Sequence, residues 1–355
     1  MAQINKPNLH FNNVLYTGNG SARTITGVGF QPDWVWVKDR DSTNFHYLYD
    51  VVRGNNLNLY TNATDGDTNV TTALGGGGIG SQASDGFTIV AGTSNTNNVN
   101  TNSNNYVSWN WKAGGAASAN SSGTISSSVS VNTTAGFSIV SYTGNATAGA
   151  TIGHGLGTTP SMMIIKRRNS GNSWRVYHKS IGATKMLTLS ATSAATTQTN
   201  IFNDTEPTSS VFSVGDSSTT NASGGTYIAY CFAEKKGYSK FGSYVGNGNA
   251  DGPFVYTGFK PSFILIKSTA SSTNWPITDD KRPAYNPTND ANFVMYANTS
   301  SAESSSSTRG ADFNSNGFKI RGTSSDVNGS SNEITYMAFA ENPIVGTNNI
   351  PATAR

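Results

Sequence analysis

One short apolar segment, bounded by a proline and a lysine, occurs three times in this chain of 355 residues. Its copies are PDWVWVK (32–38), PSMMIIK (160–166) and PSFILIK (261–267), and in each the proline stands six residues before the lysine. A sequence unit that recurs along a chain indicates a repeated structural unit. We therefore expect three copies of one fold, each built around this core segment.

The sequences on both sides of the core segments also repeat. Upstream of each copy lies a near-identical turn sequence: YTGNG (16–20), YTGNA (142–146) and YVGNG (244–248). A ring stands eight residues after each lysine, as His46, Trp174 and Trp275. Each copy closes on a run with alternating apolar residues: VSWNWK (107–112), IAYCFAE (228–234) and TYMAFAE (335–341). That period of two is typical of a half-buried β-strand.

Strand-sized runs alternate with Gly, Asn and Ser, which predicts antiparallel β-sandwiches rather than βαβ units. Only 12% of the residues are charged and 35% are hydrophobic, so Asn, Ser and Thr must form much of the surface. The core segment is apolar at every position, which suits a strand covered on both faces. Its predicted core residues are Trp34, Trp36, Met163, Ile164, Ile165, Phe263, Leu265 and Ile266.

We predict an all-β chain of three related antiparallel β-sandwich domains in tandem. The predicted boundaries are 1–115 for repeat 1, 133–236 for repeat 2, 237–346 for repeat 3 and 347–355 for a tail. Residues 116–132 are rich in Gly, Ser and Ala, which predicts a flexible linker after repeat 1. Because the connection between repeats 2 and 3 is short, these two repeats are expected to form a fixed pair.

Charge and cysteine content argue against several classes of protein. The net charge is +3 and the basic residues are scattered singly, so nucleic-acid binding is not expected. Cys231 is the single cysteine, which excludes an intrachain disulfide and suits a small buried side chain. The N-terminal residues carry no signal peptide and no stretch approaches 18 apolar residues, so we expect synthesis in the cytoplasm without membrane insertion.

Candidate catalytic residues are few. The chain has five glutamates, and Glu234 and Glu341 occupy equivalent repeat positions, which favours an architectural role over acid catalysis. The four histidines and Cys231 show no metal-ligand spacing, so no metal and no other cofactor is expected. The sequence therefore favours a protein without enzymatic activity.

An acidic and a basic residue recur three positions apart beyond two of the rings, as Asp50 with Arg53 and Asp279 with Arg282. Repeat 2 has His178 and Ile181 at the same two positions. A reactive site could lie there, but we favour an ion pair that ties a loop to the sheet.

Aromatic residues in the segments after the core segments are the candidate binding residues. Exposed rings stack on sugars or anchor a protein partner, and core packing is the alternative for each of them. The candidates are Tyr47, Tyr49, Trp174, Tyr177, Trp275 and Tyr285.

Several longer motifs carry a resemblance to a known family. They are YTGNGSARTITGVGFQPDWVWVKDR (16–40), DGFTIV (85–90), YVSWNWKAGG (106–115), GFSIVSYTGN (136–145), IGHGLGTTPSMMIIKRR (152–168), WRVYHKS (174–180), GYSKFGSYVGNG (237–248) and YTGFKPSFILIK (256–267). In this order, from about Phe11 to Pro343, the chain resembles virion structural proteins of marine tailed phages, including cyanophages, that are described as tail-fibre-like. The resemblance implies lectin-like, jelly-roll-like β-sandwiches on a phage particle, and it carries over no catalytic residue.

Three classes of function follow from these observations. We favour a non-enzymatic virion protein of a tail fibre or appendage that contacts host surface glycans. Its expected partners are other virion proteins, host surface polysaccharide and copies of itself, as a homo-oligomer on the particle. A capsid decoration protein is the alternative, which the early start of repeat 1 favours because little sequence precedes it for particle attachment. A glycan-degrading enzyme is a remote third possibility.

Overall fold

The computed structural model describes residues 3–71, 77–92, 99–282 and 293–340, together with the backbone of two short strands at 344–345 and 351–352. Nearly all regular structure in these residues is β-strand, which confirms the all-β prediction. Helical turns occur at η1 (Pro7–Leu9), α1 (Thr199–Phe202) and α2 (Ser325–Asn328). Asn, Ser, Thr and Gly disfavour helices, whereas the β-branched and aromatic runs between them favour strands.

Each repeat forms one large and one small sheet, here termed its inner and outer sheet. In spatial order, the inner sheet of repeat 1 contains β1 (Phe11–Thr17), β9 (Asn105–Trp111), β3 (Trp34–Asp39), β4 (His46–Asp50), β5 (Leu57–Tyr60) and β6 (Thr68–Asn69). Its outer sheet contains β2 (Arg23–Thr26), β8 (Gly86–Ala91) and β7 (Gly77–Ala83). All neighbouring strands in both sheets are antiparallel.

Repeats 2 and 3 follow the same plan. The inner sheet of repeat 2 contains β10 (Ser118–Asn120), β11 (Ser127–Asn132), β12 (Phe137–Thr143), β19 (Thr226–Phe232), β14 (Met162–Arg167), β15 (Arg175–His178), β16 (Lys185–Thr188) and β17 (Thr196–Thr197), and its outer sheet contains β13 (Ala150–Gly153) and β18 (Val211–Val214). The inner sheet of repeat 3 contains β20 (Ser239–Val245), β28 (Glu333–Ala340), β22 (Pro261–Ser268), β23 (Pro276–Asp279), β24 (Phe293–Tyr296) and β25 (Ser304–Ser305), and its outer sheet contains β21 (Phe254–Tyr256), β27 (Gly317–Ile320) and β26 (Ala311–Asn314). Beyond them, β29 (Ile344–Val345) pairs with β30 (Pro351–Ala352).

The core segment lies in the middle of each inner sheet. It pairs with the last strand of its repeat on one side and with the strand after it on the other, as β9-β3-β4, β19-β14-β15 and β28-β22-β23. The register is also the same, since it places these pairs opposite each other: Trp36 and Trp109, Ile164 and Tyr230, Leu265 and Met337. Residues of the three repeats can therefore be compared position by position.

Side chains of the core strands alternate between two hydrophobic cores. In β3, Val35 and Val37 face the outer sheet of repeat 1, whereas Trp34 and Trp36 enter a central core shared by all three repeats. The eight core residues predicted from the sequence are all at most 2% exposed. The expectation that each packs within its own sandwich is wrong for five of them, which lie in the central core: Trp34, Trp36, Ile164, Phe263 and Leu265. A strand that is apolar on both faces is thereby explained, because each face has its own cover.

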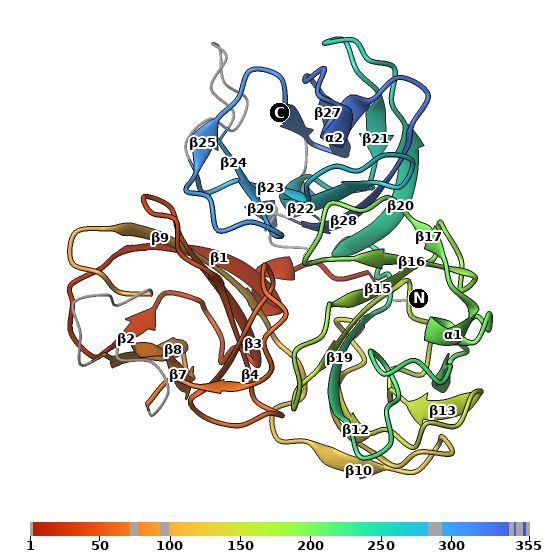
Figure 1. The fold of residues 1–355 in the computed structure, drawn as a ribbon. Coiled ribbons are helices and arrows are strands. Elements are labelled where there is room, and N and C mark those ends of the chain that lie inside the picture. The colour runs from red at the N-terminus through yellow and green to blue at the C-terminus, as the bar shows by residue number, and fades with distance from the viewer. Residues whose placement is uncertain are drawn as a thin grey trace.

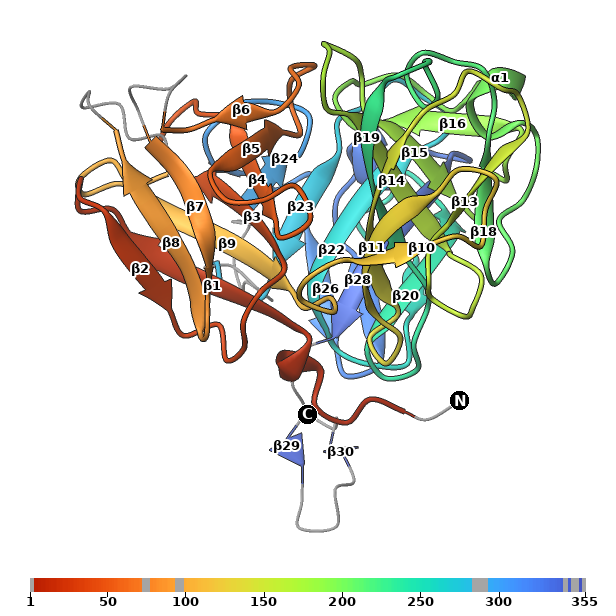
Figure 2. The same ribbon diagram turned by 90° about the horizontal axis from the view of Figure 1, so that it is seen from below.

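The three repeats are arranged around a common centre with pseudo-threefold symmetry (Figure 1). Their inner sheets face this centre, and the outer sheets lie toward the periphery. Seen from the side, the first described residues leave the body on the same face as the last strands (Figure 2). The repeats are therefore not separate beads on a string, because one central core joins them.

The predicted flexible linker is wrong, since residues 118–120 and 127–132 form two strands of the inner sheet of repeat 2. Ile125 between them makes a parallel bridge to Ile152 of β13. The Ser-rich composition concealed a period of two, in which Ile125 and Val129 are buried and exposed serines alternate with them. Cys231 is a free, fully buried thiol, as expected.

Candidate functional site

The aromatic residues proposed as a binding surface lie inside the protein. The five that the structure describes are at most 2% exposed: Tyr47, Tyr49, Trp174, Tyr177 and Trp275. A ring that is covered on both faces cannot stack on a sugar, so the binding interpretation is wrong for these five. The strands that carry them are covered by an outer sheet on one side and by neighbouring repeats on the other. Tyr285, the sixth candidate, lies outside the described residues.

Two of these rings join neighbouring repeats. Trp174 of repeat 2 donates its Nε1 proton to the carbonyl of Tyr60 at the end of β5 in repeat 1, at 2.8 Å. Trp275 of repeat 3 donates in the same way to the carbonyl of Thr188 at the end of β16 in repeat 2, at 3.0 Å. Both bonds are buried and satisfy carbonyl groups at strand ends.

His46 of repeat 1 occupies the third equivalent position. Its Nδ1 accepts a hydrogen bond from Trp36 Nε1 at 2.9 Å, so in the neutral ring the proton resides on Nε2. Nε2 faces the carbonyl of Tyr296, at the end of β24 in repeat 3, without a hydrogen bond of normal geometry. Burial lowers the pKa of His46 well below its usual value. Trp174 and Trp275 thus link repeat 2 to 1 and repeat 3 to 2 by hydrogen bonds, and His46 holds the equivalent position where repeat 1 meets repeat 3.

The junction between repeats 1 and 2 carries a chain of four charged side chains. Arg53 contacts Asp50 at 2.5 Å and Asp67 at 3.2 Å, and Asp67 in turn contacts Arg168 of repeat 2 at 2.8 Å. Tyr230 of repeat 2 donates its hydroxyl proton to Asp50 at 2.7 Å. This confirms the ion pair expected for Asp50 and Arg53 and shows that it also connects two repeats.

The junction between repeats 3 and 1 repeats this arrangement. Arg282 contacts Asp279 at 2.7 Å and Glu303 at 3.1 Å, and Glu303 contacts Arg40 of repeat 1 at 2.7 Å. Trp109 of repeat 1, at the position equivalent to Tyr230, donates its Nε1 proton to Asp279 at 3.0 Å. The expected ion pair between Asp279 and Arg282 is therefore also confirmed.

The junction between repeats 2 and 3 has no charge at any of the four equivalent positions, which hold His178, Ile181, Ala195 and Thr269. At the other two junctions a backbone bond accompanies the charges, since Asp67 N donates to Arg168 O at 2.7 Å and Glu303 N donates to Arg40 O at 2.8 Å. The equivalent bond is kept here, because Ala195 N donates to Thr269 O at 2.9 Å. His178 Nε2 contacts the carbonyl of Tyr336 at 3.2 Å. Burial lowers the pKa of His178 to about 4, so its ring is neutral near pH 7.

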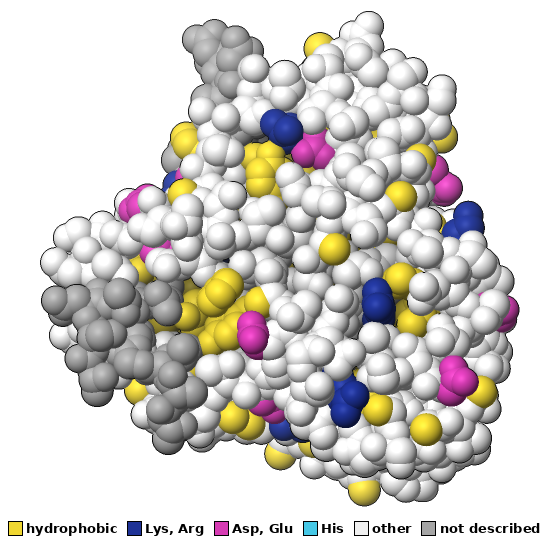
Figure 3. Space-filling view, in the orientation of Figure 1, with side chains coloured by type: hydrophobic (Ala, Val, Ile, Leu, Met, Phe, Trp, Pro, Cys, Tyr) yellow, Lys and Arg dark blue, Asp and Glu magenta, His cyan; other side chains and the backbone are white. Residues whose placement is uncertain are grey.

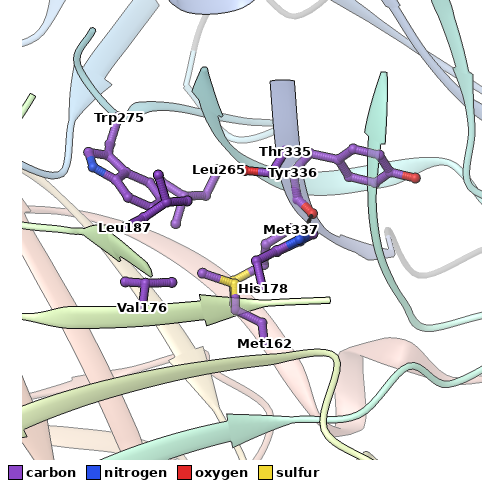
Figure 4. A pocket seen from close by; sticks show the side chains of 9 residues that line it. All are labelled: Met162, Val176, His178, Leu187, Leu265, Trp275, Thr335, Tyr336 and Met337. Carbon is purple, nitrogen blue, oxygen red and sulfur yellow. Dashed lines mark hydrogen bonds between the residues drawn. The ribbon is translucent and has the colours of Figure 1, made fainter. Parts of the chain in front are cut away.

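A small cavity lies at this third junction, between the inner sheets of repeats 2 and 3 (Figure 4). Its volume of about 10 Å³ is the space for a single water molecule. Met337 lines it at the position that Tyr230 and Trp109 fill in the other junctions. A cavity of this size with mostly apolar walls has no room for an organic ligand, so it is a packing defect and not a binding pocket.

Three buried lysines end the core segments. The ammonium group of Lys166 donates to the carbonyl of Thr64 in repeat 1 at 2.9 Å, and that of Lys267 donates to the carbonyl of Thr192 in repeat 2 at 2.8 Å. Lys38 is bound by carbonyl groups within repeat 1. Burial lowers the pKa of all three to about 8. They serve as further contacts between or within repeats.

Of the remaining candidate catalytic residues, one has a structural role and one lies outside the described residues. Glu234 binds both Lys179, at 2.7 Å, and Lys240, at 2.6 Å, which fits the architectural role expected for it. Glu341 is not among the described residues. In the described ranges, no three His, Cys, Asp or Glu side chains converge as metal ligands would. No helix in the described part of the chain has the length and hydropathy needed to span a bilayer.

On the face shown in Figure 3, charged side chains are few and dispersed, and most of the visible surface belongs to the backbone and to side chains that are neither charged nor hydrophobic. Large apolar side chains that remain exposed include Phe45 at 43%, Phe254 at 46% and Tyr256 at 65%. None of the three was among the candidates from the sequence. Phe45 lies directly before the rings chosen after the core segment of repeat 1, whereas Phe254 and Tyr256 precede the core segment of repeat 3. For Phe254 and Tyr256 the signal was the alternation around Val255 in β21.

Together these features define a class of protein in which three homologous β-sandwiches of one chain close around a single core with pseudo-threefold symmetry. The model of a family described as a domain of unknown function (DUF7483) matches residues 6–343, so the chain belongs to that family. No curated protein and no solved structure matches the chain.

Proposed function

We propose that this chain is a non-enzymatic structural protein on the surface of a tailed-phage particle, where it forms part of a tail fibre or appendage. The observation that carries the proposal is the closed ring of three repeats around one buried core. Such a body gives one chain the shape of a trimer, and it can therefore sit on a threefold-symmetric site formed by other virion proteins. The resemblance of the sequence motifs to those of phage virion proteins supports the same proposal.

The contact with host glycans in this proposal rests on Phe45, since the rings first considered are buried. Phe45 is 43% exposed and stacks on Tyr60 with ring centroids 4.9 Å apart, so one face of a held ring is accessible. Asn62 lies beside it, because its side-chain oxygen accepts a hydrogen bond from the adjacent His46 N. A fixed aromatic face next to amide groups is suited to stacking on a sugar ring.

A capsid decoration protein is the second candidate. Pseudo-threefold symmetry is equally compatible with it, because the threefold axes of a capsid lattice offer many equivalent positions for such a body. The polar surface with few charges is compatible with either position on the particle.

The position on the particle tests both candidates. Gold-labelled antibodies against the purified protein, together with its copy number relative to the major capsid protein, would distinguish them by electron microscopy and quantitative mass spectrometry. We expect few copies at one vertex. Hundreds of copies over the shell would establish the decoration role instead, and absence from purified particles would reject both. In a separate assay, Phe45→Ala should weaken retention on host polysaccharide, with the exposed Leu15→Ala as the matched control.

A further inference from the structure

The outer sheets of repeats 2 and 3 differ at one edge. In repeat 2 the edge strand β13 is covered by residues 123–127, which connect β10 to β11 and include the first residue of β11. Thr151 is bonded there through both backbone groups: its N–H donates to Thr124 Oγ1 at 2.8 Å, and its carbonyl accepts from Ile125 N at 2.9 Å. Ser127 Oγ also donates to the carbonyl of Gly153 at 2.8 Å. This covering segment runs parallel to β13.

In the equivalent strand of repeat 3, β21, no strand of the described residues pairs with the corresponding edge, since β27 is its one neighbour in the sheet. Figure 1 shows where β21 lies. Pro253 O accepts from Ile320 N at 3.1 Å and Thr257 N donates to Asn316 O at 3.0 Å, so the backbone groups of these residues point toward β27. Because peptide groups alternate along a strand, those of Phe254 and Tyr256 point away from the sheet. Among the described residues, none forms a hydrogen bond with these outward groups.

The short connection before repeat 3 explains this difference. In repeat 2 the long segment 116–132 comes before β12, and part of it folds over the β13 edge, whereas only a few residues separate β19 from β20. The exposed side chains also differ, since Phe254 and Tyr256 stand where Thr151 and Gly153 stand in repeat 2. Two large rings beside unpaired backbone groups form a surface that is apolar and able to add a strand.

We propose that β21 is a docking edge for an extended segment of a partner protein, which adds to the outer sheet of repeat 3 parallel to β21. The covering segment of repeat 2 defines the chemistry of this partner: a short extended stretch with Thr or Ser at alternate positions and a β-branched apolar residue between them. Addition of such a strand satisfies the outward backbone groups, and the rings of Phe254 and Tyr256 contact its side chains. This proposal is independent of where the protein sits on a particle.

The probe is a fluorescein-labelled peptide with the sequence SSGTISSSV, which corresponds to residues 121–129. Fluorescence anisotropy should show saturable binding to the full-length wild-type protein. Tyr256→Pro removes the outward N–H without touching the bonds to β27, since proline is tolerated at a strand edge whose N–H faces solvent. We expect this substitution to weaken binding about tenfold or more. Thr26→Pro, at the equivalent position of β2, is the matched control and should leave binding unchanged.

Two further measurements keep the test decisive. Phe254→Thr combined with Tyr256→Thr retains the backbone and should weaken binding less than Tyr256→Pro does, with an unchanged melting temperature. No binding at millimolar peptide, or equal binding by Tyr256→Pro, would overturn the proposal. A concentration-dependent dimer in sedimentation that Tyr256→Pro abolishes would also overturn it, because the occupant of the edge would then be a second copy of this chain.

Discussion

The three junctions between repeats solve one packing problem in two ways. At the junctions of repeats 1 and 2 and of repeats 3 and 1, four charged side chains form a continuous chain that is buried at its first carboxylate and arginine and partly exposed at its other end. A ring donates a hydrogen bond to the first carboxylate. At the junction of repeats 2 and 3 all four charges are replaced together by His178, Ile181, Ala195 and Thr269. The same position that supplies the ring elsewhere holds Met337.

This difference indicates that the four charged residues of a junction depend on one another for stability. A buried carboxylate needs its guanidinium, and a buried guanidinium needs its carboxylate, so a change at one position is tolerated only when the partners change as well. Met337 stands at the position of Tyr230 and Trp109 but has no proton to donate to a hydrogen bond. The neutral ring of His178, unlike the carboxylate of an aspartate, does not need a donor there. The backbone bond between Ala195 and Thr269 persists, which indicates that the backbone contacts fix the junction while the side chains determine its electrostatics.

The largest expected effect follows from breaking a charged junction at one residue. Asp50→Ala leaves Arg53 buried with its main partner missing and Tyr230 without an acceptor. We expect a loss of about 3–5 kcal/mol in the free energy of unfolding, measured by urea denaturation. Asp312→Ala, which breaks a more exposed pair with Arg321, is the control and should cost less than about 1 kcal/mol.

A double substitution sharpens this result. Asp50→His together with Arg53→Ile copies the pair of repeat 2 into repeat 1 and leaves no unpaired guanidinium. If the charges act as one unit, the double variant should be more stable than Asp50→Ala alone. A double variant that loses as much as the sum of its two single changes would show that the positions are independent.

The next effect is a pH dependence of stability that arises at the junction of repeats 2 and 3, where His178 replaces an aspartate. Burial lowers the pKa of His178 to about 4, whereas an unfolded histidine titrates near 6.5. Between these values the unfolded state binds more protons than the folded state, so stability is present above about pH 6.5 and is lost as the pH falls toward 4. The loss from this residue should reach up to about 3 kcal/mol at pH 4.

Comparison with a variant assigns that loss to one residue. His46 is shifted in the same direction by burial, so the wild-type protein contains at least two contributions. His178→Asn keeps a side chain that can donate to the Tyr336 carbonyl but cannot titrate. Its unfolding free energy should depend less steeply on pH between 4 and 6.5 than that of the wild type, and parallel curves would contradict the assignment.

A smaller effect is expected from the ring at the charged junction. Tyr230→Phe keeps the packing of the ring and removes only the hydroxyl that donates to Asp50 at 2.7 Å. A hydrogen bond to a charged group contributes about 1.5–3 kcal/mol, so a loss of about 2 kcal/mol is expected from urea denaturation. Trp174→Phe removes an equally buried donor to a neutral carbonyl and should cost less from the hydrogen bond itself, although it also reduces the ring volume.

Local features of the fold could be predicted from the sequence. Repetition of the core segment identified three related units, and its apolar residues at successive positions correctly indicated a strand covered on both faces. The spacing of Asp50 and Arg53 identified an ion pair, because residues three apart on a tight connection are held within reach of each other.

The sequence could not predict which part of the chain buries each apolar face. For this reason the interpretations of residues 116–132 and of the candidate binding rings were wrong. Apolar periodicity reports that a face is buried but not whether the same repeat or a neighbour buries it. From the sequence, Trp174 was therefore compatible both with an exposed ring and with a core ring, and the carbonyl that it binds belongs to Tyr60 in another repeat. Ile125 was missed because composition dominated the interpretation of its Ser-rich surroundings, while the strand that it contacts lies further along the chain.

The smallest effect is expected at Met337 and tests whether the junction of repeats 2 and 3 tolerates substitution at this position. Met337 lines the cavity and donates no hydrogen bond, so Met337→Leu should change the free energy of unfolding by less than about 1.5 kcal/mol, as volume-conserving apolar changes do. Met337→Trp, which copies the residue of repeat 1, inserts a ring larger than a cavity of about 10 Å³ can accept and should cost about 1–3 kcal/mol. Addition of His178→Asp and Ile181→Arg would supply the acceptor and the charge that this ring has at the junction of repeats 3 and 1. If the junctions are equivalent in their backbones, the triple variant should recover part of the stability lost by Met337→Trp. A further loss of stability in the triple variant would show that the backbone around His178 is not equivalent to the backbone at the other two junctions.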